Sequence, residues 1–128
     1  MKRSMFGAYV KGSNDAVEFY QKAFGATVKN AHKNEDGTYM HAELDIFGQV
    51  FTVTEALPEW GERVAGNTMQ INLHMGEGNE EAVKRAYNVL KEGAAPNNPM
   101  HNSLGECLFS PLMFGLIDKF GVNWCVFI

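Results

Sequence analysis

Two short polar patterns contain most of the side chains in this sequence that could do chemistry. His41 and Glu43 stand two residues apart, and Gln70, Asn72 and His74 follow the same spacing. Side chains two positions apart on a β-strand point to the same side of a sheet. A histidine and a carboxylate placed in this way can bind a divalent cation or transfer protons. One hypothesis is therefore that His41, Glu43 and His74 form a metal site or an acid–base pair.

A second interpretation gives the same residues no chemical role. His41 and Glu43 would then be the solvated side of an edge-like strand, and His74 would be a polar residue near a strand end. We prefer this interpretation, because a polar alternation in one sequence is weak evidence for a site. His32 and His101 stand among polar, turn-like residues, and we assign them no role.

The two cysteines, Cys107 and Cys125, are candidate nucleophiles of another kind. A reactive thiol needs a nearby base or positive charge that lowers its pKa. Cys125 stands between Trp124 and Val126, which favours a buried and inert thiol, and Cys107 is interpreted in the same way. Nothing indicates a disulfide, so we expect a reduced, cytoplasmic protein.

The residue pattern predicts a repeated order of strands and one helix. In the first half, strands are expected over residues 5–10, 27–32, 39–47 and 49–55, with a helix that starts near Ser13, Asn14 or Asp15 and ends at Gly25. In the second half, strands are expected over residues 68–75, 104–109, 113–117 and 122–128, with a poor edge strand over 94–100 and a helix over 77–92. A tight turn from Asp118 to Gly121 should precede the last strand.

We interpret both halves as βαββ modules, with matching residue types at a period of about 65 to 73 residues. We predict an α+β fold of two paired βαββ modules, residues 1–56 and 68–128, joined by a connector over 57–67 within a single domain. Each helix should cover one sheet face, and the other faces should form a curved mixed sheet around a cleft. Trp60 in the connector could act in a lid over the cleft, although we prefer a role as a plug of the core.

Charge and apolar composition argue against two classes of partner. The chain has 128 residues, of which 45% are hydrophobic, and a formal net charge of -4 with charges of both signs scattered along it. No basic stripe is present to meet phosphates, which argues against nucleic acid. No apolar stretch approaches the ~20 residues of a membrane span.

Three segments in the same order along the chain resemble a known family. They are residues 17–26 (VEFYQKAFGA), 41–44 (HAEL) and 118–124 (DKFGVNW). With the paired βαββ order, they are similar to the vicinal oxygen chelate superfamily of glyoxalase I, bleomycin-resistance proteins and extradiol dioxygenases. Within it, the chain most resembles the PhnB-like branch, whose members carry a 3-demethylubiquinone methyltransferase label. No glycine-rich loop that would hold a nucleotide-like cofactor accompanies that label here.

The resemblance implies four positions for a divalent metal, which enzymes of the superfamily fill with His, Glu or Gln. In this sequence the positions fall on Met5, Thr52, Gln70 and Cys125. Only Gln70 fits that pattern, since Met and Thr are poor ligands for such a cation and Cys departs from it. We therefore expect no metal and no other cofactor, with a divalent metal as the alternative.

Strand periodicity gathers a set of side chains on the expected cleft side. These candidate ligand-binding residues are Tyr9, Thr52, Gln70, Asn72, His74, Cys125 and Phe127. Apolar walls with a few polar groups are typical of sites for small, partly apolar molecules, so we expect such a ligand and a homodimer. The alternative is a metal-dependent lyase or dioxygenase that uses Gln70 and His74 with His41 or Glu43. A third interpretation is a structural or regulatory dimer whose cleft is filled by its own side chains.

Overall fold

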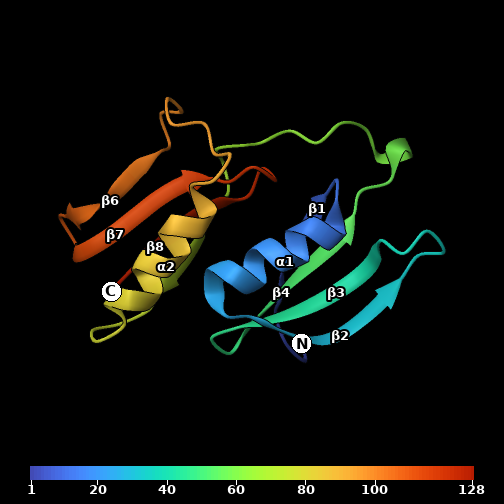
Figure 1. Cartoon of the computed structure of the whole chain (residues 1–128), viewed down its shortest axis with the longest axis horizontal. Coiled ribbons are helices and arrows are strands. Elements are labelled where there is room, and N and C mark those ends of the chain that lie inside the picture. The colour runs from blue at the N-terminus through green and yellow to red at the C-terminus, as the bar shows by residue number, and fades with distance from the viewer. The chain divides into compact units, whose positions relative to one another are not determined.

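The computed structural model describes all 128 residues and consists of two compact units (Figure 1). The units are Met1–Val64, called module 1, and Ala65–Ile128, called module 2. Their boundary falls within the expected connector. Each unit holds a four-stranded mixed sheet and one α-helix, which confirms the α+β class and the repeat. The order within each unit is βαβββ, with one more strand after the helix than the predicted βαββ.

Module 1 contains its strands in the order β1-β4-β3-β2 across the sheet. Its elements are β1 (Phe6–Val10), α1 (Ser13–Phe24), β2 (Thr27–Lys33), β3 (Tyr39–Ile46), β4 (Gln49–Glu55) and the short 3-10 helix η1 (Pro58–Trp60). β1 pairs with β4 in parallel, and the other two pairings are antiparallel. β3 therefore lies inside the sheet, between β4 and β2.

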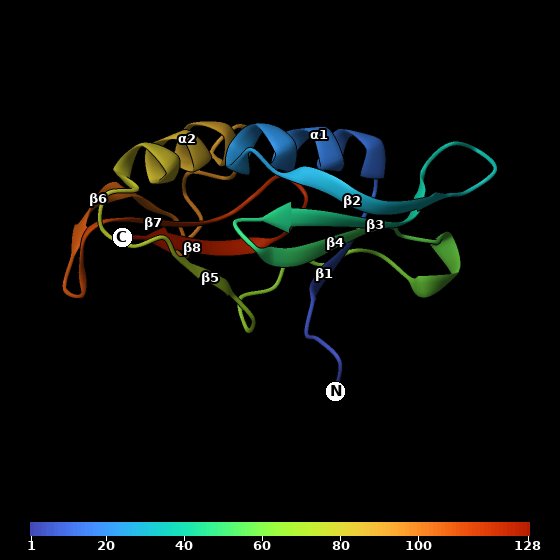
Figure 2. The same ribbon diagram turned by 90° about the horizontal axis from the view of Figure 1, so that it is seen from below.

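Helix α1 covers one face of this sheet (Figure 2). Its Tyr20 ring meets the Phe51 ring edge-on at 5.2 Å between centroids, and Phe51 is almost completely buried. Leu44 and Val53 share that face because the strand alternation places them beside Phe51 in the β3–β4 register. The opposite face, which α1 does not cover, is called open face 1.

Helix α1 starts at Ser13, within the predicted range, but none of the side chains of Ser13, Asn14 and Asp15 caps it. Gly12 occupies the N-cap position, and no side chain of the helix caps it. The carboxylate of Glu55 on β4 accepts hydrogen bonds from the backbone N–H groups of Gly12 and Ser13, at 3.1 and 2.8 Å. A carboxylate is favourable there because the helix N-terminus presents unpaired N–H groups and a partial positive charge. Gly25 ends the helix in a left-handed conformation, as predicted.

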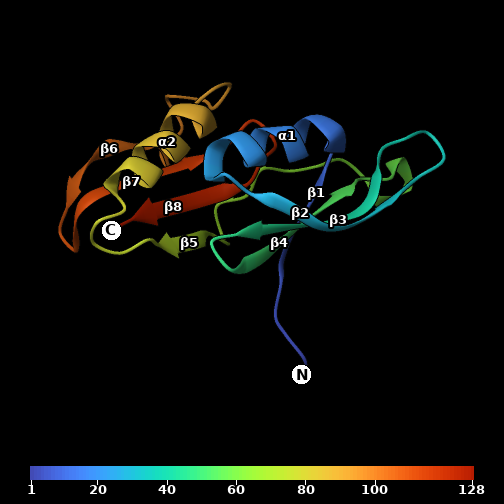
Figure 3. The ribbon, with the colours of Figure 1, turned by 60° about the horizontal axis from the view of Figure 1, so that its bottom comes forward.

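Module 2 repeats the strand order of module 1 as β5-β8-β7-β6. Its elements are β5 (Ile71–His74), α2 (Glu80–Leu90), β6 (Asn102–Cys107), β7 (Ser110–Ile117) and β8 (Asn123–Phe127). β5 pairs with β8 in parallel, and the other pairings are antiparallel. Tyr87 of α2 packs on Phe114 of β7 with ring centroids 5.2 Å apart, so the Phe114 side of the sheet is the helix-covered side. The other side is called open face 2 (Figure 3).

Two predictions for module 2 are wrong. Residues 94–100 form turns and no strand, because Pro96 and Pro99 lack the N–H groups that a ladder needs; β6 is the edge strand instead. Helix α2 begins at Glu80, three residues later than expected, because Gly76 and Gly78 both adopt positive φ in a turn ahead of it.

The turn before β8 matches the prediction. Asp118 Oδ1 accepts from the backbone N–H groups of Phe120 and Val122, at 2.8 and 3.1 Å, and Gly121 has φ 87°. Asp118 Oδ2 also accepts from the Trp124 indole N–H at 2.9 Å, and both residues are buried. This carboxylate therefore joins the turn to the core of module 2.

No helix of the structure combines the length and the apolar character that crossing a membrane requires.

Candidate functional site

Open face 1 carries the polar side chains of the three strands β1, β4 and β3. The register places Gly7, Thr52 and Glu43 in one row across these strands, and Tyr9 next to Thr54 in a second row. A side chain on Gly7 would collide with Thr52 Oγ1, so glycine at this position lets the threonine hydroxyl lie over β1. Tyr9 is exposed and Thr52 is half-buried.

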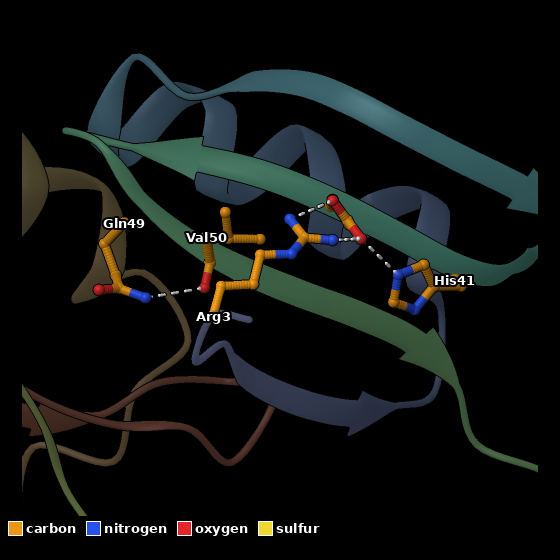
Figure 4. A network of polar contacts seen from close by, with 5 residues as sticks. Arg3, His41, Gln49 and Val50 are labelled. Atoms are coloured by element: carbon orange, nitrogen blue, oxygen red, sulfur yellow. Dashed lines mark hydrogen bonds and ion pairs between the residues drawn. The ribbon is translucent and has the colours of Figure 1, made fainter. Parts of the chain in front are cut away.

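Glu43 is the centre of a polar cluster on this face (Figure 4). Arg3 donates to both of its carboxylate oxygens, from Nη1 to Oε2 at 3.1 Å and from Nη2 to Oε1 at 2.9 Å. His41 Nε2 lies 3.2 Å from Glu43 Oε1, within hydrogen-bonding distance when that nitrogen carries a proton. The Arg3 hydrogen bonds, followed by that of His41, hold the pKa of Glu43 below its usual range. We call these three residues the Arg3 cluster.

The preferred interpretation of these residues needs a correction. Glu43 is only 6% exposed and lies on an interior strand, so it is not the solvated side of an edge-like strand. The carboxylate tolerates burial because the Arg3 guanidinium compensates its charge. His41 belongs to the same cluster, whereas His74 lies in module 2.

Open face 2 carries the module 2 candidates on two adjacent strands, β5 and β8. The register pairs Asn72 with Cys125 and His74 with Phe127. The His74 and Phe127 rings stack, with centroids 4.7 Å apart and planes 18° from parallel. Phe109 meets Phe127 edge-on at 5.1 Å and is 65% exposed. These three rings form what we call the aromatic platform.

Amide side chains lie on the same face, toward the N-terminal ends of β5 and β8 and away from the aromatic platform. Gln70 Nε2 donates to Asn123 Oδ1 at 3.2 Å, and Asn72 Nδ2 donates to the Gln70 carbonyl oxygen at 3.3 Å. Asn123 is 5% exposed, and its Nδ2 is buried without a hydrogen-bond acceptor. A buried donor without a partner is costly, so Nδ2 is a donor whose hydrogen bond is not made within the chain.

Cys125 is buried among these residues. Burial raises the pKa of its thiol, and the neighbouring Cys107 raises it further. The thiol is therefore the dominant form at neutral pH, which disfavours nucleophilic attack and agrees with the inert thiol that the sequence predicts. Neither cysteine is in a disulfide.

The four positions that the superfamily uses for a metal do not suit one here. In module 1, Met5 precedes β1 and is 41% exposed, and Thr52 offers a neutral hydroxyl. In module 2, the Gln70 amide is bonded to Asn123, and Cys125 has a raised pKa. These weak or protonated donors do not match the imidazole and carboxylate ligands that divalent cations favour. The structure has no group of three or more His, Cys, Asp or Glu residues arranged to hold a metal.

Several residues near the candidates escaped the sequence analysis. Arg3 follows Lys2 ahead of the first strand, and nothing local indicates that it meets a carboxylate 40 positions later. Asn123 shares a sheet face with Cys125 and Phe127 through the alternation of β8, and the predicted site does not include it. Phe109 was assigned to a strand, whereas it lies in the β6–β7 turn. Trp60 is 48% exposed and contacts the Tyr9 ring at 5.1 Å, so it does not plug the core.

Comparison with known proteins identifies the fold. No protein-family model and no curated protein matches the sequence. A PhnB protein from Bacillus cereus with a 3-demethylubiquinone-9 3-methyltransferase label is similar in structure, with a TM-score of 0.74 and 20% identity over 99% of this chain and 98% of that one. A gene product from Arabidopsis thaliana has a TM-score of 0.67 and 24% identity, over 100% of this chain and 99% of that one.

A fosfomycin resistance protein, FosX from Listeria monocytogenes, is also similar, with a TM-score of 0.69 and 12% identity over 98% of this chain and 91% of that one. A mutant form of FosX has been crystallised with Mn(II) and a dihydroxypropylphosphonic acid. At these identities the similarity identifies the fold and leaves the chemistry of each site to its own residues. This chain has a glyoxalase-like fold, which it shares with the PhnB protein and FosX.

Proposed function

We propose that this protein binds a small, partly apolar molecule on open face 2, centred on the β5–β8 strand pair. The aromatic platform supports this proposal, because it gathers three rings at one end of the face, the stacked His74–Phe127 pair and the exposed Phe109 that meets Phe127 edge-on. Small-molecule sites typically combine such a surface with a few polar groups that orient the ligand.

The observation that carries the proposal is an orphan amide donor on the same face, at the other end of β8 from this platform. Asn123 and Phe127 are four positions apart on this strand, which is roughly 13 Å along it, so the ligand must extend along β8. Asn123 Nδ2 is buried with no acceptor, while Asn123 Oδ1 is fixed by the Gln70 amide. This hydrogen bond leaves Nδ2 as the donor that remains to be satisfied. The ligand we propose therefore has a planar apolar part for the platform and a carbonyl or carboxylate oxygen for Asn123.

We also propose that binding needs no metal at the superfamily positions, since Met5, Thr52, Gln70 and Cys125 form a poor ligand set. The proposal concerns ligand binding alone, whether a reaction follows or the ligand is only sequestered. A metal-dependent lyase or dioxygenase is the alternative, for which no residue on open face 2 provides a second imidazole or carboxylate beside His74.

The test is an NMR titration of the full chain with planar probes, namely 2-naphthoate, cinnamate and their amides. We expect shifts of the β5 and β8 amide signals and of the Asn123 side-chain amide. Phe127→Leu should weaken binding by roughly tenfold, as expected for removal of one aromatic contact. Phe47→Leu is the matched control, because Phe47 is an exposed aromatic residue of module 1.

Two results would contradict the proposal. One is a set of shifts that lies outside β5 and β8 for every probe, and the other is binding that Phe127→Leu leaves unchanged. A thermal shift with Zn, Ni or Mn that disappears in His74→Ala would favour the metal-dependent alternative.

A further inference from the structure

The Arg3 cluster of module 1 differs in kind from the other buried carboxylate of the chain. Asp118 is held by donors two to six residues away, in its own turn and at the start of β8. Glu43 is held by a guanidinium from 40 residues earlier and by His41 on its own strand. Arg3, the main charge partner of Glu43, thus lies outside the sheet.

Arg3 belongs to a segment that is weakly attached to module 1. Residues 1–5 form no helix or strand, and all five are exposed. Figures 2 and 3 show this segment running away from the sheet on the side opposite α1. The Arg3 side chain is still 47% exposed, whereas the side chain of Glu43 is 8% exposed. Ion pairs with a solvent-exposed partner contribute little to stability, so this contact can exchange.

We propose that Glu43 and His41 form a binding subsite for a guanidinium or amidinium group of a small molecule, and that Arg3 occupies this subsite until the ligand displaces it. The contact geometry supports this ligand class. Two parallel N–H donors meet the two carboxylate oxygens, which a planar, forked cation can do and a single ammonium cannot. The subsite lies in module 1 and is independent of the proposal for open face 2.

The surroundings of Glu43 suit such a ligand. His41 Nε2 supplies a third polar contact at Oε1, and Thr52 lies directly opposite Glu43 in the β3–β4 register. The Arg3 and His41 hydrogen bonds hold the pKa of Glu43 below its usual range, so its carboxylate is ionised at neutral pH. When Arg3 leaves, the carboxylate keeps the His41 contact, and both of its oxygens can accept from another forked cation.

The test is isothermal titration of the full chain with benzamidine, and with benzamide as the neutral probe of the same shape. Arg3→Ala removes the internal competitor, so benzamidine should bind about tenfold more tightly if Arg3 fills the subsite about 90% of the time. Arg63→Ala is the matched control, because Arg63 is in module 1 and donates to the carbonyls of Trp60 and Gly61, away from Glu43. It should leave the affinity unchanged.

Glu43→Gln in the Arg3→Ala background should abolish benzamidine binding. Asp45→Asn is its control, since Asp45 is two residues further on β3 and accepts from the Gly48 N–H. The proposal is overturned if Arg3→Ala binds benzamidine no more tightly than the natural chain, or if benzamide binds equally well. Arg3→Ala decides the matter even if Glu43→Gln fails to fold, because Arg3 lies outside the sheet. Neither outcome bears on ligand binding at the aromatic platform.

Discussion

The Asp118 carboxylate provides a quantitative prediction about how module 2 is held together. Asp118→Ala removes at least three hydrogen bonds, from Phe120 N–H, Val122 N–H and the Trp124 indole. Each bond to a charged group contributes roughly 1.5–3 kcal/mol, and bonds to one acceptor are not additive. We therefore expect the free energy of unfolding to fall by about 3–5 kcal/mol.

Module 1 offers a matched control at the corresponding turn. Asp45 precedes Phe47 and Gly48 as Asp118 precedes Phe120 and Gly121. Its carboxylate accepts a hydrogen bond from the Gly48 N–H at 2.7 Å, and the residue is half-buried. Asp45→Ala should cost about 1 kcal/mol or less, because this carboxylate is not tied to a buried side chain as Asp118 is tied to Trp124.

The assay is urea unfolding followed by tryptophan fluorescence, with the two variants and the natural chain measured side by side. Asp118→Asn adds a second arm, since it keeps an acceptor for the backbone donors and loses the charge. It should fall between the other two variants. If Asp118→Ala and Asp45→Ala differ by less than about 1 kcal/mol, the carboxylate does not join the turn to the core as described.

Three further predictions concern the faces of the two sheets. The lowered pKa of Glu43 means that its ionised carboxylate stabilises the fold at pH 7. This stability should be lost as the pH falls below about 4.3, the ordinary pKa of a glutamate, and through the lowered pKa of Glu43. In acid denaturation profiles, the stability difference between the natural chain and Glu43→Gln should therefore shrink over this range. Gly7→Ala should destabilise module 1 by about 1–3 kcal/mol through its collision with Thr52 Oγ1, and Thr52→Ala should relieve most of this loss in thermal unfolding. Cys125 should resist iodoacetamide at pH 7 in the folded chain and react after unfolding, as mass spectrometry of the labelled peptides would show; rapid labelling of the folded chain would contradict the raised pKa.

The features that the sequence predicts correctly have local causes. Asp118 followed by Gly121 produces the turn through hydrogen bonds within four residues, and Gly25 ends α1 because it adopts positive φ without strain. The alternation of apolar residues along β3 and β4 places Leu44 and Phe51 under α1. Such features need no knowledge of the tertiary fold.

The features that the sequence does not predict depend on contacts between distant residues. Glu55 caps α1 from 42 residues away, and Arg3 neutralises Glu43 from 40 residues away. Glu43 therefore looks like a solvated residue in the alternation of β3, whereas it is buried beside a partner that has no local signal. The role of the seven proposed ligand-binding residues remains a prediction. The structure gives their positions in the two modules, and their ligand is a proposal.

The most direct test of the central proposal is the side-chain amide signal of Asn123 during titration with 2-naphthoate. We predict that the two Nδ2 protons shift as the probe binds, because its carboxylate gives this buried donor an acceptor. The shift should weaken in Phe127→Leu and persist in Phe47→Leu. A saturable binding event that leaves the Asn123 signal in place would contradict the account of open face 2.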